Sequence, residues 1–383
     1  MELKAKTTTT LKNQMPEKVY RSLKQRLSYS SLKQYDKSRS TFFKENILGL
    51  YVEKEETLAT LLGSICHLMF ADPDYGSENY DISSNPEFDA KFVLSQAEIP
   101  TGQMGELIEM LLKRTKQSLD TEGIQTDSFE NIFKDAVTNV KYDYNLKEVK
   151  FIGKNMETIL ELFQKPDKKG NIPETYYQEA LKNVNKSLVS VNILDKAKSL
   201  VDMTFSHPHT SDIMNLHQGC NTEVFREMVI LYELRGLEYR SMVDMLHVNH
   251  DDQTIQPFDF KITYDVETGF EYTYLKFSYY LQIGLYDFAV RSWALEHDLG
   301  AYKVLPMQYI AIDAQGNASP VVYKMTSTDV LMGQRGFSIR GKTYNGVLGI
   351  HSELSWNLES GDWATSKKIA DSMGKINMNL KYR

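Results

Sequence analysis

The stretch PFDFKITYD, residues 257–265, places an acid and a base on one face of a predicted strand. Side chains alternate across a pleat, so Asp259 and Lys261 point one way while Phe258 and Phe260 point the other. A carboxylate can hold a hard divalent cation, and an ammonium beside it can orient a water molecule or a phosphate. On a solvated strand the same pair is an ordinary surface salt bridge. The neighbouring residues decide between the two interpretations.

A second carboxylate, Asp244, ends the preceding predicted strand, fifteen residues before Asp259. Adjacent strands can bring both carboxylates to one end of a sheet, where they repel each other unless a cation lies between them. Mg²⁺ is typically held by one or two protein carboxylates, with waters and substrate phosphate oxygens completing its shell. The pattern therefore predicts a site for Mg²⁺ or Mn²⁺ at this end of the sheet, with Lys261 beside it.

A third carboxylate is expected from the first strand of the same hairpin. Glu227 lies nine residues before Gly236 and Asp244 lies eight residues after it, so the hairpin folds them toward the same end. Glu223, four residues earlier, is the competing choice.

Two further features have a structural and a functional interpretation. Tyr279, Gln282 and Tyr286 share one stripe of a predicted helix. The stripe is either a packed face with satisfied hydroxyls or a set that orients substrate. His67, in LGSICHLMFADPD, is either a buried, hydrogen-bonded histidine or a ligand that completes a divalent-metal site.

The elements that must position these residues follow from the periodicity. Ser28 or Ser30 is expected to cap a helix in LSYSSLKQY, and a second helix should end at Pro73. From residue 224 the period changes to two, which predicts a hairpin turning at Arg235-Gly236 and then the strand IQPFDFKIT. One long helix is expected over FEYTYLKFSYYLQIGLYDFAVRSWALEHD. Two strands, in VLPMQYIAID and SPVVYKMT, and a final amphipathic helix, ATSKKIADSMGKINMNLKYR, should follow.

Composition limits the class of protein. The 383 residues are 42% hydrophobic and 11% aromatic, which is ample for a core. No apolar run approaches the roughly 18 residues of a membrane helix, and the N-terminus lacks a secretory signal, so a cytoplasmic protein is expected. Cys66 and Cys220 cannot form a disulfide framework or a four-thiolate site. The net charge of −7 confines nucleic-acid contact to local basic surfaces, one candidate being residues 17–39 with seven Lys/Arg and two acids.

Taken in order, these motifs resemble the RecE type (exonuclease VIII) of the PD-(D/E)XK nuclease superfamily, the RecB-like branch found in phage and prophage recombination modules. LSYSSLKQYDKS is similar to the family's N-terminal helix, GSICHLMFADPD to its histidine segment and REMVILYELRGLEYRSMVDML to its glutamate and aspartate strands. PFDFKIT resembles the D-x-K-T strand and YYLQIGLY the Y-x-x-Q-x-x-x-Y helix. The usual proline before the first aspartate is Val243 here, and Ile262 replaces the threonine after the lysine.

The resemblance implies roles for individual residues. His67, Asp244 and Asp259, with the Phe260 carbonyl, would hold one or two Mg²⁺ or Mn²⁺ ions, and Glu227 would bind a second metal or the nucleophile. Catalytic roles are implied for Lys261, Glu227, Gln282 and Tyr286: Lys261 would position the attacking water, and Gln282 would hold Lys261 or a phosphate. Tyr279 and Tyr286 would lie near the DNA backbone. Basic residues expected to contact DNA are Arg235, Arg240, Lys276 and the 18–39 run.

The implied fold is α/β, a PD-(D/E)XK core with a mixed central sheet flanked by helices and a large helical insertion. The expected organisation is an N-terminal arm (1–26), the N-terminal helical part of the core (27–75), the insertion (76–200), the catalytic core (201–326) and a C-terminal extension (327–383). The expected function is Mg²⁺-dependent exonucleolytic hydrolysis from the ends of double-stranded DNA in phage-type recombination. Expected partners are DNA ends, a single-strand annealing protein and further copies of the chain, but no membrane. The alternatives are an endonuclease, a catalytically silent or structural phage DNA-binding protein on the same fold, and surface salt bridges alone.

Overall fold

In a computed structural model the described residues are 8–11, 15, 17–23, 25–50, 58–72, 74–77, 80–95, 186–216 and 221–374. They divide into two compact units, the first formed by Met1–Glu53 with Asp202–Arg383 and the second by Lys54–Val201. Much of the predicted insertion, including GELIEMLLKRTKQSL, lies outside the described residues.

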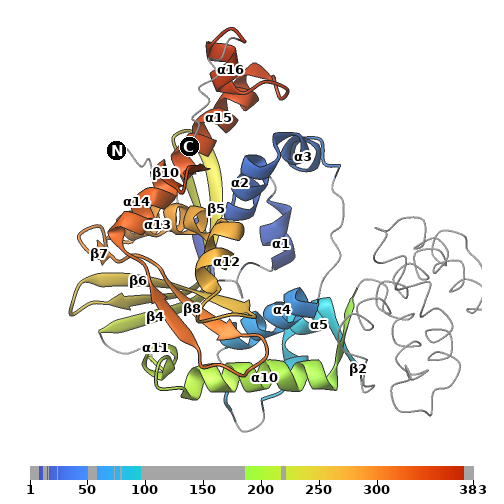
Figure 1. Cartoon of the computed structure of the whole chain (residues 1–383). Helices are drawn as coiled ribbons and strands as arrows, with labels where there is room; N and C mark the ends of the chain where they lie inside the picture. Colours follow the sequence, from blue (N-terminus) through green and yellow to red (C-terminus); the bar gives the residue numbers. More distant parts are fainter. Residues whose placement is uncertain are drawn as a thin grey trace, which may run out of the picture. The chain divides into compact units, whose positions relative to one another are not determined.

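The first unit is built on a seven-stranded mixed sheet (Figure 1). Its strand order is β1-β4-β5-β6-β8-β9, and the short β7 also pairs with β6. The pairs β6–β8 and β6–β7 are parallel and the others are antiparallel. The strands are β1 (Thr8–Leu11), β4 (Thr222–Leu234), β5 (Leu237–Asn249), β6 (Thr254–Thr263), β7 (Lys303–Val304), β8 (Gln308–Asp313) and β9 (Val321–Lys324).

Helices α2 (Tyr29–Lys37) and α13 (Tyr279–Glu296) cover one face of this sheet, and their apolar side chains join those of β4, β5, β6 and β8 in the main core. The expectation of a mixed central sheet flanked by helices is confirmed. Ser28 caps α2 with a capping box formed with Ser31, which resolves the choice between Ser28 and Ser30. On the other face, the Arg226 guanidinium donates to the Met214 carbonyl of α11 (Ser211–Met214) at 2.9 Å.

The turn of the central hairpin determines the register of its two strands. β4 and β5 pair from Thr222↔Asn249 to Leu234↔Leu237, leaving Arg235 and Gly236 as a two-residue loop. Both have positive φ, 49° and 86°, as a type I′ turn requires, and glycine makes that conformation accessible at the second position. The turn therefore fixes the register, which sets Glu227 opposite Asp244.

Three predicted elements up to residue 313 differ from the structure. The expected N-terminal arm (1–26) contains β1, which pairs with β4, and α1 (Glu17–Ser22). The single helix expected over 270–298 is two helices, α12 (Phe270–Lys276) and α13, because Ser278 adopts a left-handed conformation with φ 59°. The strand expected over 304–313 is split into β7 and β8, with Leu305, Pro306 and Met307 between them.

The C-terminal region joins the core of the first unit. It contains α14 (Ser327–Arg335), the hairpin β10 (Gly336–Ile339) and β11 (Lys342–Asn345), α15 (Val347–Ser360) and α16 (Lys367–Asp371). α14 packs closely on α13 because Gly284 and Gly333 face each other; a Cβ at Gly333 would lie 2.1 Å from the Tyr280 carbonyl oxygen. Of the long terminal helix expected over 364–383, only α16 is helical among the described residues, and residues 375–383 lie outside them.

The second unit contains α4 (Leu58–Ala71), α5 (Pro86–Lys91) and a parallel pair of strands, β2 (Phe92–Ser95) and β3 (Ser187–Ser190). β2 and β3 lie within the insertion predicted to be helical over 76–200, and α10 (Val191–Ser206) begins directly after β3. Among the described residues, the remaining short helical turns are α3 (Arg39–Phe42), the π-turn Phe43–Ile47 and the 3-10 turn Ile82–Ser84. Among the described helices, none has the length and apolar character needed to cross a bilayer.

Candidate active site

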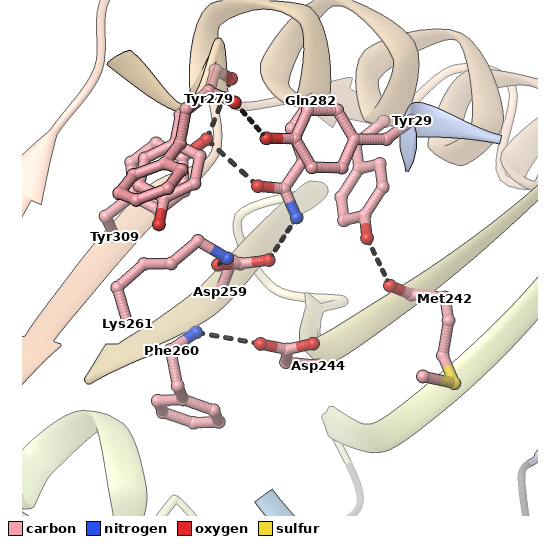
Figure 2. Close-up of polar contacts among 11 residues, drawn as sticks. Tyr29, Met242, Asp244, Asp259, Phe260, Lys261, Tyr279, Gln282 and Tyr309 are labelled. Atoms are coloured by element: carbon pink, nitrogen blue, oxygen red, sulfur yellow. Dashed lines mark hydrogen bonds and ion pairs between the residues drawn. The ribbon is translucent and has the colours of Figure 1, made fainter. Parts of the chain in front are cut away.

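The candidate site lies where β5 and β6 stop pairing. The ladder between them runs from Asn249↔Thr254 to Met245↔Phe258 and ends there, while β6 continues beside β8. Asp244 and Asp259 are the next residues on the two strands. The Phe260 backbone N–H donates to Asp244 Oδ2 at 2.8 Å, so a side-chain carboxylate replaces a ladder carbonyl (Figure 2). The fork brings Asp244 and Asp259 together, as the spacing predicts, but both residues lie within their strands and not at an end of the sheet.

Asp259 and Lys261 form an ion pair in this fork. The Asp259 side chain is 1% exposed and that of Lys261 is 16% exposed. Burial disfavours the charged lysine, but the attraction of Asp259, with smaller contributions from Tyr279 and Asp244, outweighs burial and raises the pKa of Lys261. The ammonium also lies 4.9 Å from the centre of the Tyr279 ring and 5.7 Å from that of Tyr309. Lys261 is therefore held as a cation beside two aromatic rings.

Gln282 fixes the other oxygen of Asp259. Its side-chain amide donates to Asp259 Oδ1, and its Oε1 accepts from the Tyr309 hydroxyl at 3.4 Å. The same hydroxyl donates to the Tyr279 carbonyl at 2.9 Å. Both ends of the Gln282 amide are thus used. Its amide binds Asp259, whereas the resemblance implied Lys261 or a phosphate as its partner. The effect is to hold Asp259 in one orientation.

Tyr286 and Tyr279, from the same helical stripe, have different positions. Tyr286 is buried, and its hydroxyl donates to the Met242 carbonyl at 2.5 Å, two residues before Asp244. That contact anchors β5 to α13 beside the fork. Tyr279 is half-buried and lies over Lys261. Tyr286 therefore binds the backbone of β5 from within the core, whereas Tyr279 is partly accessible to solvent.

Glu227 faces Asp244 across the hairpin. The flanking pairs Arg226↔Met245 and Met228↔Val243 place the two opposite each other, and their carboxylates approach to within 4.8 Å. Both side chains are buried, at 3% and 8% exposure. Glu227 has a φ of 48°, a conformation that is costly for a non-glycine residue and that concentrates at functional sites. Of the two candidate glutamates, Glu227 is the one that the fold brings to the fork.

Glu223 is engaged elsewhere. Its carboxylate lies 2.7 Å from His250 Nε2, and His250 Nδ1 lies 2.9 Å from the Tyr302 hydroxyl. The sequence spacing admitted both glutamates because four residues on a strand preserve the face. Glu227 has a left-handed backbone conformation and Glu223 does not, and this difference cannot be recognised from residue types alone.

The remaining candidates have these locations. His67 lies on α4, in the second unit, and is half-buried; its place as a metal ligand stays a prediction. The Arg240 guanidinium donates to the Tyr20 carbonyl and lies over the Tyr20 ring at 4.8 Å, so its contacts are internal. Lys276 and Arg235 are exposed. A role for any of these residues in DNA binding stays a prediction.

Two residues of the site were not anticipated. Tyr309 of β8 orders Gln282 and borders Lys261, and the Tyr29 hydroxyl of α2 donates to the Phe277 carbonyl at 2.5 Å. Tyr309 lies within an apolar strand and Tyr29 follows a capping serine, so neither has a local signal. Only the pairing of β8 with β6 and the packing of α2 on α13 reveal them.

The donor set suits a hard divalent cation. Oxygens sharing one Mg²⁺ lie up to about 4.2 Å apart, twice the metal–oxygen distance of about 2.1 Å. Glu227 and Asp244 reach this separation with a small side-chain adjustment. Their oxygens are the ligand type that Mg²⁺ and Mn²⁺ prefer, so the residues fit such an ion.

Comparison with known proteins finds a likeness in structure but no match to a family model or to a curated sequence. No protein-family model matches the chain, and no curated protein matches it in sequence. A solved structure from Eubacterium rectale, described as a "Putative exonuclease", is similar, with 12% identity and a TM-score of 0.42; the match covers 100% of this chain and 96% of that chain. A likeness at this level carries no functional argument, and the function is inferred below from the site itself.

Proposed function

We propose that the protein is a metal-dependent nuclease that hydrolyses phosphodiester bonds of DNA. The observation that supports this proposal best is the fork. It gathers an acid pair, Glu227 and Asp244, and a buried Asp259–Lys261 pair at the point where β5 and β6 separate. A salt bridge on a solvated face would not account for their burial or for the strained backbone of Glu227.

The residues have complementary roles in this proposal. Glu227 and Asp244 would hold the metal together with Asp259 and the Phe260 carbonyl, and His67 of α4 is proposed as a further ligand because of its sequence motif. A divalent metal, when bound, supplies Lewis-acid polarisation of the scissile phosphate. Lys261 orients the attacking water or neutralises charge on the phosphate. Gln282 and Tyr286 act as positioning residues, because they bind Asp259 and the β5 backbone.

The reaction is a hydrolysis. A water oxygen forms a bond to phosphorus, the bond from phosphorus to one sugar oxygen breaks, one proton leaves the water, and the departing oxygen takes up a proton. No element that would read base sequence was recognised along the chain, and phosphate contacts position a nucleic acid without reading its sequence. We therefore propose that a requirement for a DNA end limits cleavage, as the resemblance to RecE-type exonucleases implies. A setting in phage-type recombination, with an annealing protein as partner, belongs to the same proposal.

The test is digestion of end-labelled linear duplex and covalently closed circular DNA with Mg²⁺, with Mn²⁺ or with EDTA. We expect the linear duplex to be degraded from its ends only with metal, and closed circles to be spared. Closed circles cut as fast as linear duplex would indicate an endonuclease. Binding of DNA without cleavage by any metal would instead indicate a catalytically silent DNA-binding protein.

A further inference from the structure

An exposed patch of aromatic and basic side chains lies where α12 meets α13. The aromatic patch consists of Tyr272, Lys276 and Phe277, together with Lys33 of α2. Tyr272 is 69% exposed and Phe277 is 41% exposed. The Lys276 ammonium lies 5.8 Å from the Tyr272 ring centre and 5.4 Å from that of Phe277, and Lys33 lies 5.5 Å from the Phe277 ring centre. Two cations therefore border aromatic rings that remain accessible.

The presentation of Phe277 is fixed by local structure. Ser278, the next residue, has a left-handed φ of 59°, which breaks the helix and turns the chain. The Phe277 carbonyl accepts a hydrogen bond from the Tyr29 hydroxyl at 2.5 Å, from a helix far away in sequence. A left-handed non-glycine residue costs on the order of 1–3 kcal/mol and persists only where its surroundings hold it. An aromatic side chain is thus kept at the surface by a strained turn.

The aromatic patch is continuous with the candidate active site. The Phe277 and Tyr279 rings are stacked, with centres 5.9 Å apart, and the Tyr279 ring lies 4.9 Å from Lys261 Nζ. Aromatic surface thus extends from solvent to the cation of the fork. Tyr29 lies beside both, since it contacts Phe277 through its hydroxyl and Lys33 through its ring at 5.3 Å. A strand whose phosphate reaches Lys261 would have its neighbouring bases near Phe277.

The chemistry favours a nucleic acid with unpaired bases. Aromatic side chains bind single strands by base stacking, and cationic groups beside them neutralise the phosphates. A bilayer or an apolar protein partner would require a larger apolar area than two rings bordered by lysines. We propose that the aromatic patch stacks on an unpaired base at the end of the DNA strand that enters the site, with Phe277 as the main platform. This inference rests on the proposed nuclease function for the identity of the ligand.

Binding without metal separates this inference from hydrolysis. The probe is a short DNA duplex with a three-nucleotide single-stranded overhang that carries 2-aminopurine, compared with a blunt duplex, both in EDTA. Stacking on Phe277 should quench 2-aminopurine and should make the wild type bind the overhang more tightly than the blunt end. We expect Phe277→Ala to abolish the quenching and to reduce overhang affinity roughly tenfold, within the range for one lost base–aromatic stack.

Leu358→Ala on α15 is the matched control, because Leu358 is 43% exposed and lies outside the aromatic patch. It should leave quenching and affinity unchanged, and a thermal melt of each variant checks folding. Wild-type binding with no preference for the overhang, or undiminished quenching in Phe277→Ala, would overturn the inference. Quenching that depends on Phe277 in a protein that hydrolyses no DNA with any metal would support the stacking site and contradict the nuclease proposal.

Discussion

Two positions along the β4–β5 hairpin ladder contain similar residues in different environments. At the fork, Glu227 and Asp244 are buried and opposed, and the backbone of Glu227 is left-handed. Near the start of β4, Glu223 pairs with His250, and both side chains remain about one-third exposed. The ladder is regular around Glu223 and interrupted at Glu227. Burial and an interrupted ladder, rather than residue type, therefore distinguish a candidate site from a surface ion pair.

The largest expected effect is the loss of folding stability when Lys261 is replaced by alanine. Lys261→Ala would leave the carboxylate of Asp259 buried without its cation, and breaking a buried pair from one side costs roughly 3–5 kcal/mol. Chemical denaturation should show this loss, whereas Lys303→Ala on the exposed surface of β7 should change stability by less than about 0.5 kcal/mol. The double variant Lys261→Ala/Asp259→Asn should recover much of the loss. No recovery would mean that the pair is not the source of the effect.

Lys261→Ala should also lower the rate of hydrolysis by a factor of roughly 10² or more. This is the scale of losing one preorganised charge at a transition state. Hydrolysis of linear duplex is measured well below the melting temperature of Lys261→Ala, so that only folded protein is compared. The stability-restored double variant should remain inactive. Digestion by Lys261→Ala at the wild-type rate would remove Lys261 from the mechanism.

A pH effect is expected from His247, which lies on β5 between Asp244 and the residue opposite Glu223. Burial, with a contribution from Arg226, lowers its pKa from 6.5 to about 4. As the pH falls below 6.5 the unfolded chain binds a proton that the folded chain does not, so stability decreases. The expected contribution is about 2 kcal/mol between pH 7.5 and pH 5. His247→Leu should reduce the pH dependence of the unfolding free energy by this amount; an unchanged dependence would show that His247 is not responsible.

Gln282→Leu tests the support of Asp259. It removes the amide that binds Asp259 Oδ1 and the acceptor of the Tyr309 hydroxyl, so a loss of roughly 1–3 kcal/mol in stability is expected. As a positioning residue, Gln282 should also affect metal dependence, because a misplaced Asp259 weakens the site. The Mg²⁺ concentration for half-maximal digestion should therefore rise in this variant. A stability loss with unchanged metal dependence would assign Gln282 a purely structural role.

The smallest expected effect is at the regular part of the ladder. Glu223→Gln removes one member of a partly exposed ion pair, which is worth about 0–1 kcal/mol. Hydrolysis should be unaffected. If Glu223→Gln instead abolished digestion while Glu227→Gln did not, the distinction between the two positions would be reversed.

Much of the site could be predicted from local spacing. The Arg235-Gly236 turn fixes the hairpin register and hence the opposition of Glu227 and Asp244, and strand alternation places Asp259 and Lys261 on one face. The break at Ser278 could not be predicted, because the apolar pattern runs through it and only contacts with distant residues such as Tyr29 hold the left-handed turn. The partner of Gln282 depends on the crossover from β6 to β8 and has no local signal.

Metal binding tests the central claim most directly. Calorimetric titration should show that Mn²⁺ binds to the wild type. The Mn²⁺ affinity of Asp244→Asn and of Glu227→Gln should be at least roughly tenfold weaker, and that of Glu223→Gln should equal the wild-type affinity. Added Mn²⁺ should also raise the melting temperature of the wild type through linkage, and should do so less in the two fork variants. Equal Mn²⁺ affinity in the wild type and in both fork variants would contradict the assignment of the fork as a metal-dependent active site.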